Sequence, residues 1–498
     1  MTHAPRTTRV PRWALPLALS ALVVGWQLSF LSVPVQPRVR WAMSASMGLC
    51  ADAPHFFYFY HHLGQFPVGA LETPQLGPGR ADALAFVAKH GDRLRMDFGG
   101  PTNTPRFGDY GKLWLFEPDV WLRHDPAHPS LLPFNMLLFV AALLSVLWAF
   151  WLEGHALLGV LLVLFVGSDP FQLVETYGRG NVFSLPVSVT LLALAGHVRL
   201  LAGRGAGRGA WVLAAVSGVA LACVREVRAE AGLVGLSLLA LYALVPNTPW
   251  RRRALLVAAF LVTGALAGRG WQAYWDGRFA EARRFVAAAG GQVCDAPYGT
   301  HHAFWHAAYC GLGDFGGDRG FEWSDQGAFR WATTYDPATN PHPLAMHYSG
   351  GFYFDETYDG VNHVAPTDVP AYNALVRGRV TGEIARHPLW YARILGQRVL
   401  AVLGDAVPAG IAAGRWTLAL PGAGWLAPLL FAAFVWRRRR FEAALVAFVL
   451  PLSLLPVMIY SGRGMTFYGI AHLVALAAGI AWWAGARGGA SRERTSDG

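Results

Sequence analysis

The chain has 498 residues, of which 54% are hydrophobic and only 14% are charged, and its formal net charge is +10. Soluble domains carry about 25% charged residues, so this composition excludes an ordinary soluble protein. Most of the clustered positive charge lies in short arginine groups beside apolar stretches, a pattern that favours membrane topology over nucleic-acid binding.

Ten apolar blocks follow one another along the chain. About 20 apolar residues cross the hydrocarbon core of a bilayer as a helix, so each block predicts a transmembrane helix. The first block is long for a signal-peptide core, and no small-residue cleavage site follows it closely, so we expect an uncleaved helix. The blocks are 13–33, 131–152, 155–168, 182–201, 210–224, 231–246, 253–268, 423–436, 441–460 and 467–486.

Arginine clusters mark the cytoplasmic side of these helices. With ten spans, every predicted cytoplasmic site except the turn at 153–155 carries basic residues. An eleventh span at 389–413 would place Arg437 to Arg440 outside, against this bias. We therefore predict an all-α polytopic membrane protein with about ten transmembrane helices, both termini in the cytoplasm and two extracytoplasmic soluble segments. Its parts are the N-terminus and first helix (1–33), the first outer loop (34–130), a six-helix block (131–269), a large outer domain (270–421), three helices (422–486) and a cytoplasmic tail (487–498).

The disputed segment, 371–404, has apolar residues at roughly helical spacing, interleaved with five arginines. This pattern predicts a basic amphipathic helix on an anionic membrane surface, broken at Pro388. A helix that packs on the outer domain is the alternative. The same outer domain contains Cys294 and Cys310, and an extracytoplasmic location predicts that they form a disulfide.

Carboxylates and guanidinium groups gather at the predicted outer ends of the helices rather than in their apolar centres. Examples are Asp169, Glu175 and Arg179 after the third span, and Arg225 and Glu226 after the fifth. A transporter is expected to bury polar groups near the membrane midplane. An enzyme that acts on a lipid headgroup would place them at the interface, so the distribution favours an enzyme.

Four stretches stand out in this layout: an acidic residue before an aromatic run at 50–63, a span that ends in an arginine and an acid at 219–230, a tryptophan-rich stretch at 271–277, and a helix at 383–398. Together with the order of spans and outer segments, they resemble the integral-membrane GT-C glycosyltransferases, the group that includes protein mannosyltransferases and aminoarabinose transferases. The resemblance implies sugar transfer from a polyprenyl-phosphate donor, with a catalytic acid in the first outer loop. The family's Asp-Glu pair is here a single Asp52.

Sugar transfer to a hydroxyl needs a carboxylate that takes the acceptor proton. Asp52 is the candidate base, with Asp109 and Glu72 in reserve; an ordinary helix-capping Asp is the alternative. A leaving lipid phosphate needs positive charge, which the planar fork of arginine supplies. Arg463 is the first candidate ligand, followed by Arg225 and Arg179, although an arginine can also simply anchor the end of a span. Glu175 and His306 complete the predicted substrate-binding set.

His302 and His306 lie one helical turn apart, with His301 beside them, but no acid separates them. This spacing occurs often by chance, so no metal site is assigned, and a divalent metal cofactor is left open.

The sequence thus predicts an inverting, GT-C-like glycosyltransferase in the inner membrane of a bacterial type of cell. Its partners would be membrane lipids, a polyprenyl-phosphate-linked sugar donor and a lipid or glycan acceptor of the cell envelope, without nucleic acid. The rival predictions are a transporter or flippase of lipid-linked glycans and a glycan-binding scaffold.

Overall fold

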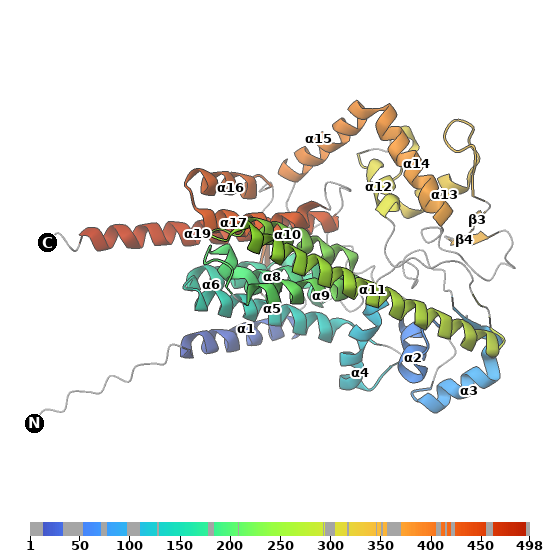
Figure 1. The fold of residues 1–498 in the computed structure, drawn as a ribbon. Helices are drawn as coiled ribbons and strands as arrows, with labels where there is room; N and C mark the ends of the chain where they lie inside the picture. Colours follow the sequence, from blue (N-terminus) through green and yellow to red (C-terminus); the bar gives the residue numbers. More distant parts are fainter. Residues whose placement is uncertain are drawn as a thin grey trace, which may run out of the picture.

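A bundle of long apolar helices forms the body of the molecule, and smaller helices gather at one end of it (Figure 1). The fold is that of a computed structural model. The structure describes residues 13–32, 53–70, 77–96, 110–126, 129–177, 184–207, 209–291, 293, 304–315, 318–344, 346–349, 352–355, 370–404, 410–413, 416–419, 424–454 and 462–494.

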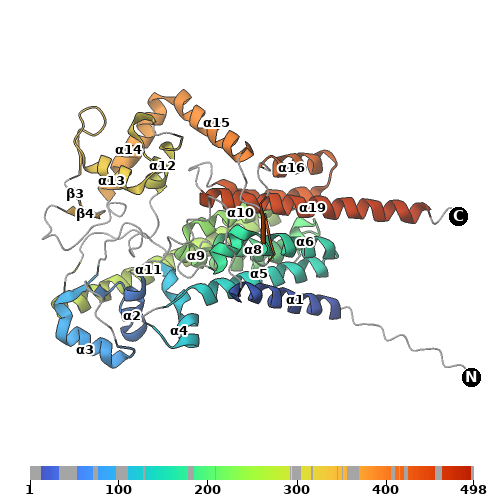
Figure 2. The ribbon, with the colours of Figure 1, turned by 180° about the vertical axis from the view of Figure 1, so that it is seen from behind.

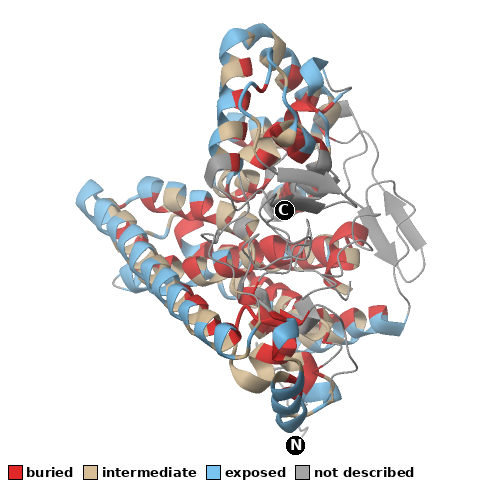
Figure 3. Ribbon diagram, turned by 90° about the vertical axis from the view of Figure 1, so that its right-hand side faces the viewer, coloured by how far each residue is buried: buried red, intermediate tan, exposed pale blue. Residues whose placement is uncertain are grey.

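The bundle helices follow the apolar blocks of the sequence. Apolar side chains from most of them form the largest core, and the buried residues lie on the inward faces of the helices (Figure 3). The helices are α1 (Ala14–Ser32), α5 (Leu132–Leu152), α6 (Ala156–Gly167), α7 (Pro170–Tyr177), α8 (Leu185–Leu201), α9 (Ala210–Val227), η5 (Ala229–Leu233), α10 (Val234–Leu244), α11 (Trp250–Ala288), α16 (Leu426–Trp436), α17 (Arg440–Val449), η8 (Leu450–Leu454) and α19 (Gly462–Arg494).

Five helices in the described residues are long and apolar enough to cross a membrane, or six if the bent pair α6 and α7 counts as one span. Three further apolar helices are shorter. The chain is therefore a helical membrane protein, as its composition indicates. The count of ten spans stays a prediction.

The bundle has two distinct ends. Helix α1 begins and α19 ends at the same end, which we call the terminal end (Figures 1 and 2). An even number of spans requires this arrangement. The small helices lie at the opposite end, which we call the domain end (Figure 2). The location of the terminal end in the cytoplasm stays a prediction.

The tight turn between α5 and α6 needs a glycine. Gly154 has a φ of +81°, a left-handed conformation that glycine adopts without steric cost. Beside the turn, the Glu153 carboxylate pairs with Arg204 at 2.6 Å and with Arg199 at 3.5 Å. These arginines neutralise the only acidic residue of a turn that carries no basic residue of its own.

Helices α9 and α11 pack so closely at Gly218 that no larger side chain fits between them. A Cβ atom on Gly218 would lie 2.3 Å from the carbonyl oxygen of Phe260 and 2.4 Å from Oγ1 of Thr263. The Thr263 hydroxyl donates a hydrogen bond to the carbonyl of Ala215 at 2.8 Å. Small residues permit such close helix packing in membranes, where helix association depends on van der Waals contact and interhelical hydrogen bonds.

A second core lies at the domain end, where Trp275, Phe279, Ala282 and Val286 of α11 are buried against the segment after α1. Helix α11 therefore continues without a break through position 270, where the sequence predicts the outer domain to begin. The elements of that segment are α2 (Ala53–Leu63), β1 (Gly69–Ala70), α3 (Arg80–His90), η2 (Gly91–Arg93), β2 (Leu94–Arg95), η4 (Tyr110–Phe116) and α4 (Glu117–Arg123), with β1 and β2 antiparallel.

A third core unites helices from the predicted outer domain. Its centre is Arg379, whose guanidinium carbon lies 4.6 Å from the ring centroid of Phe321 and 4.4 Å from that of Trp331. Burial lowers the pKa of Arg379, while the aromatic faces stabilise its charge. The elements are α12 (Phe304–Leu312), η6 (Asp318–Gly320), α13 (Asp325–Thr333), α14 (Pro370–Arg386) and α15 (Pro388–Gly404), with the hairpins β3–β4 (Met346–Ser349, Phe352–Asp355) and β5–β6 (Gly410–Ala413, Trp416–Ala419) nearby in the chain.

The predicted amphipathic helix is two helices, broken at Pro388 as expected. Helix α14 turns its apolar face, with Tyr372, Val376 and Val380, into the third core. For this half of the segment the structure shows the alternative, a helix that packs on other helices of the same domain. Helix α15 differs, because only part of its surface reaches that core.

Candidate functional site

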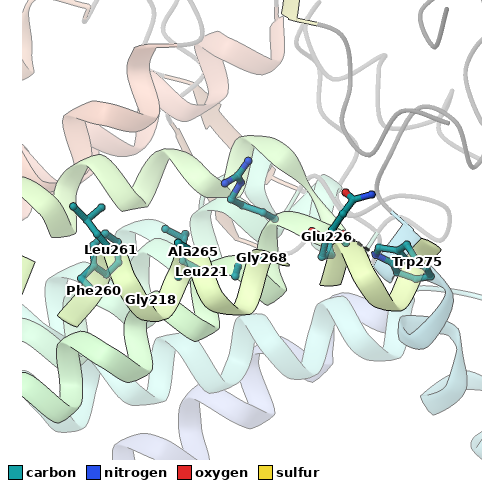
Figure 4. A pocket seen from close by; sticks show the side chains of 12 residues that line it. Gly218, Leu221, Glu226, Phe260, Leu261, Ala265, Gly268 and Trp275 are labelled. Carbon is teal, nitrogen blue, oxygen red and sulfur yellow. Dashed lines mark hydrogen bonds between the residues drawn. The ribbon is translucent and has the colours of Figure 1, made fainter. Parts of the chain in front are cut away.

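A groove of about 370 Å³ runs between α9 and α11 toward the domain end (Figure 4). Its apolar part includes Gly218 and Gly264, where the two helices touch, and Gly268, where a Cβ atom would meet nothing within 4 Å. Arg225, Glu226, Gln272 and Trp275 line its other part. An apolar channel with a few convergent polar groups is the usual form of a small-molecule site. The remaining lining residues are Leu221, Ala222, Phe260, Leu261 and Ala265.

The arrangement suits an amphiphile with an apolar chain and an anionic head. Leu261, in the apolar part, is 50% exposed, so this part is open on its outer side. Arg225 lies in the last turn of α9, where the helix reaches the domain end. Its planar guanidinium can bind two oxygens of a phosphate at once.

A buried carboxylate lies in the polar part of the groove. Glu226 is 7% exposed, and Oε2 of its carboxylate accepts a hydrogen bond from Nε1 of Trp275 at 2.8 Å (Figure 4). This bond ties the end of α9 to α11. It also restrains the orientation of the Glu226 carboxylate, while Arg225, the preceding residue of α9, is exposed.

An aromatic ladder connects the groove with α2. The ring of Trp275 stacks on Trp114 at 5.4 Å between centroids, with an angle of 16° between the planes. Nε1 of Trp114 donates a hydrogen bond to the hydroxyl of Tyr60 at 2.7 Å. Tyr60 belongs to the aromatic run that follows Asp52 in the sequence, so Trp114 connects this run to Trp275 in the wall of the groove.

The next residue of α2, His61, forms a histidine–carboxylate pair. Nδ1 of His61 lies 3.1 Å from Oε1 of Glu117, and both side chains are 26% exposed. Phe57 stacks on the His61 ring at 5.4 Å. The adjacent His62 contacts the ring of Tyr58 at 4.6 Å, and burial, followed by the nearby His61, lowers the pKa of His62 below 6.5.

The lowered pKa of His62 predicts acid sensitivity at this place. As the pH is lowered below 6.5, His62 becomes protonated in the unfolded chain at a higher pH than in the folded protein. The free energy of unfolding therefore decreases on acidification, until the pH reaches the lower pKa of the folded state. We expect amide protection in α2 to decrease below pH 6.5 and the decrease to be smaller in His62→Gln. Hydrogen exchange, corrected for its intrinsic pH dependence, measures this. A His90→Gln variant on α3 is the control, and an identical decrease in both variants would contradict the assignment.

A second group of buried polar residues lies where α6 and α7 meet at an angle of 65°. Asp169 is fully buried, and its carboxylate accepts a hydrogen bond from the backbone N–H of Gln172 at 3.0 Å. Asp169 thus caps the N-terminus of α7. The side chain of Gln172 donates to Thr176 at 3.2 Å. Glu175 is buried on the same short helix, at 8% exposure, but does not line the groove.

The structure locates three of the predicted site residues. Arg225 lines the groove, Glu175 lies on α7, and His306 is buried in the third core, where its Nδ1 lies 2.6 Å from the Tyr372 hydroxyl. His306 thus lies in a core that contains none of the residues lining the groove. Asp52, Glu72, Asp109 and Arg179 lie outside the described residues, and Arg463 is on α19 with its side chain outside them.

The metal and disulfide predictions remain open. Among the described residues, no group of three or more His, Cys, Asp or Glu side chains could hold a metal ion, and His301 and His302 lie outside them. Cys310 is buried on α12 with its sulfur 3.9 Å from Nε2 of His306, whereas Cys294 lies outside the described residues.

Sequence reasoning placed Glu226 at the end of a span but did not include it, Trp275, Trp114 or Tyr60 in the site. The signal was present in the two tryptophans of the 271–277 stretch. Comparisons with protein-family models, curated proteins and solved structures gave no match.

Proposed function

We propose that the chain is a GT-C-like glycosyltransferase that moves a sugar from a polyprenyl-phosphate donor to a cell-envelope acceptor on the outer face of the inner membrane. The groove between α9 and α11 is the observation that supports this most. It combines an apolar part within two membrane-spanning helices with an arginine, a glutamine and a carboxylate at one end. A polyprenyl phosphate has the matching chemistry, an apolar chain that ends in an anion.

In this proposal Arg225 binds the phosphate oxygens and stabilises the negative charge that develops as the sugar leaves. The donor's chain lies along Gly264 and Gly268. Asp52, at the start of the aromatic run, takes the proton of the acceptor hydroxyl. Glu226, held by Trp275, keeps its orientation and limits the space beside the sugar. The terminal end of the bundle then faces the cytoplasm.

Filling the groove tests the donor site. We expect Ala265→Trp to weaken donor binding, because the indole occupies the space of the isoprenoid chain; each 1.4 kcal/mol of lost contact lowers affinity about tenfold. The measurement is binding of radiolabelled polyprenyl phosphate to the full-length protein in nanodiscs, followed by sugar transfer in membranes. The matched control is Leu266→Trp, the next residue of α11, which is 60% exposed and does not line the groove. If both variants bind polyprenyl phosphate equally well, the groove is not the donor site.

One observation favours a second candidate, a transporter of lipid-linked glycans. The bend of 65° between α6 and α7, with buried Asp169 and Glu175, is similar to the broken helices that line transporter sites. Reconstituted vesicles separate the two functions. Movement of a labelled lipid-linked sugar between leaflets, without transfer to an acceptor, would favour the transporter, whereas transfer without such movement would favour the enzyme.

A further inference from the structure

Helix α15 carries an apolar surface that no described part of the chain covers. Leu389 is 86% exposed, Leu400 70% and Val399 56%. Ala392, Arg393 and Gly396 are exposed as well, and a Cβ atom on Gly396 would meet nothing within 4 Å. These six positions recur at spacings of three and four residues, so they form one face of the helix, which we call the open face.

The opposite face of α15 is firmly attached to the third core. Ile394 is 4% exposed, and Nε of the buried Arg398 donates to Oδ2 of Asp314 at 3.0 Å. The ring of Trp390 stacks on Phe321 at 5.8 Å. These contacts fix the rotation of α15 about its own axis, so the open face points away from the third core.

Charge and position indicate what covers the open face. Helix α15 contains Arg393 and Arg398 and no acidic residue, and Arg386, just before it, has a side chain that is 61% exposed. The helix runs from α14 toward α16, an apolar helix of the bundle (Figures 1 and 2). It is not among the described helices that are apolar enough to span. A helix that combines one apolar face with basic residues, and that is not apolar enough to span, is suited to a membrane interface.

We propose that the open face of α15 inserts into the outer surface of the same membrane that the bundle crosses, with Arg386 and Arg393 on anionic lipid headgroups. Leu389, Val399 and Leu400 then reach the boundary between headgroups and acyl chains. The third core is connected through the chain to α11 and α16. Insertion of α15 would attach it to the membrane directly as well. This inference is independent of the proposed enzymatic function.

Lipid quenching tests the contact directly in the full-length protein. A fluorescent amino acid is introduced at position 400, at control position 381 or at control position 385; Thr381 and Ala385 are exposed on α14. The protein is reconstituted in vesicles with acyl-brominated lipids and an anionic lipid fraction. We expect bromine near the top of the chains to quench position 400 more than bromine near the methyl end, because interfacial helices bury their apolar face only about 5–10 Å deep. Both control positions should lose little fluorescence.

The double substitution Leu389→Asp and Val399→Asp should reduce the quenching at position 400, whereas Thr381→Asp should leave it unchanged. Because the spans keep every variant in the membrane, loss of quenching reports on α15 alone. Quenching at position 400 no greater than at the controls would overturn the proposal. Energy transfer between two labelled copies without lipid quenching would overturn it too, since a second copy of the chain would then cover the open face.

Discussion

Replacing Asp52 by Asn is expected to reduce sugar transfer by about 10²–10⁴-fold, the usual contribution of general base catalysis. The amide keeps the shape of the carboxylate but cannot accept the proton of the acceptor hydroxyl. Expression and membrane insertion should be unchanged. The assay is transfer from a polyprenyl-phosphate sugar to the acceptor in membranes that carry each variant.

The matched control for Asp52 is Asp92→Asn, an exposed aspartate of η2 in the same segment of the chain. It should retain full activity. If Asp52→Asn also turns over normally, the base is Asp109 or Glu72, each tested by its own carboxamide variant. Normal turnover by all three variants would remove the catalytic carboxylate from this segment and leave the transporter as the better explanation.

The same assay tests the arginines. Arg225→Ala and Arg463→Ala should weaken donor use, because a leaving phosphate loses a charged partner. Arg225→Lys should restore little, since lysine keeps the charge but not the planar fork. If Asp52 and an arginine act in one transition state, the effects of the double variant should be far from additive.

The second large effect is expected at the crossing of α9 and α11. Gly218→Val adds a branched side chain where even a Cβ atom would lie 2.3 Å from a backbone oxygen of α11, so the two helices must separate. Overpacking costs about 1–3 kcal/mol in well-packed cores, and more where backbone must move. We expect a lower yield of folded protein and a clearly lower melting temperature in detergent.

Gly277→Ala is the control. Gly277 lies on α11, the helix that Gly218 contacts, but a Cβ atom at position 277 meets nothing within 4 Å. Alanine favours a helix over glycine by about 1 kcal/mol, so this variant should be as stable as the parent or more so. A Gly218→Val protein with an unchanged melting temperature would show that the close approach of the two helices is not required for folding.

Most of the bundle was predictable, because a membrane imposes a simple requirement on sequence. The block 131–152 became α5 (Leu132–Leu152), and 210–224 became α9 (Ala210–Val227). Exclusion of water from the hydrocarbon core forces backbone groups into helices, so apolar length alone identifies them. The same rule says nothing about where a helix ends beyond the membrane, which is why the extension of α11 to Ala288 was not foreseen.

The site was harder to predict, since it depends on contacts between distant segments. Arg225 was identified from its place at a span end, but the bond from Trp275 to Glu226 joins residues 49 positions apart. Spacing along the chain gives no information on such a pair. Likewise, the spacing of apolar residues in 371–404 predicts a single amphipathic helix. In the structure Pro388 separates α14 from α15, so the apolar face of α14 packs into the third core while an apolar face of α15 is exposed.

The unbroken course of α11 has a mechanical consequence. At 1.5 Å per residue, its 39 residues form a rod about 58 Å long, shared by the membrane bundle and the core at the domain end. A rod of that length is a lever: a tilt of about 5° at its membrane half would carry its far end through about 5 Å. The tilt of a membrane helix is set by its packing against neighbouring helices, here by the close contact of α11 with α9 at Gly218. This contact in the bundle therefore also sets the position of the domain-end core at the far end of the rod.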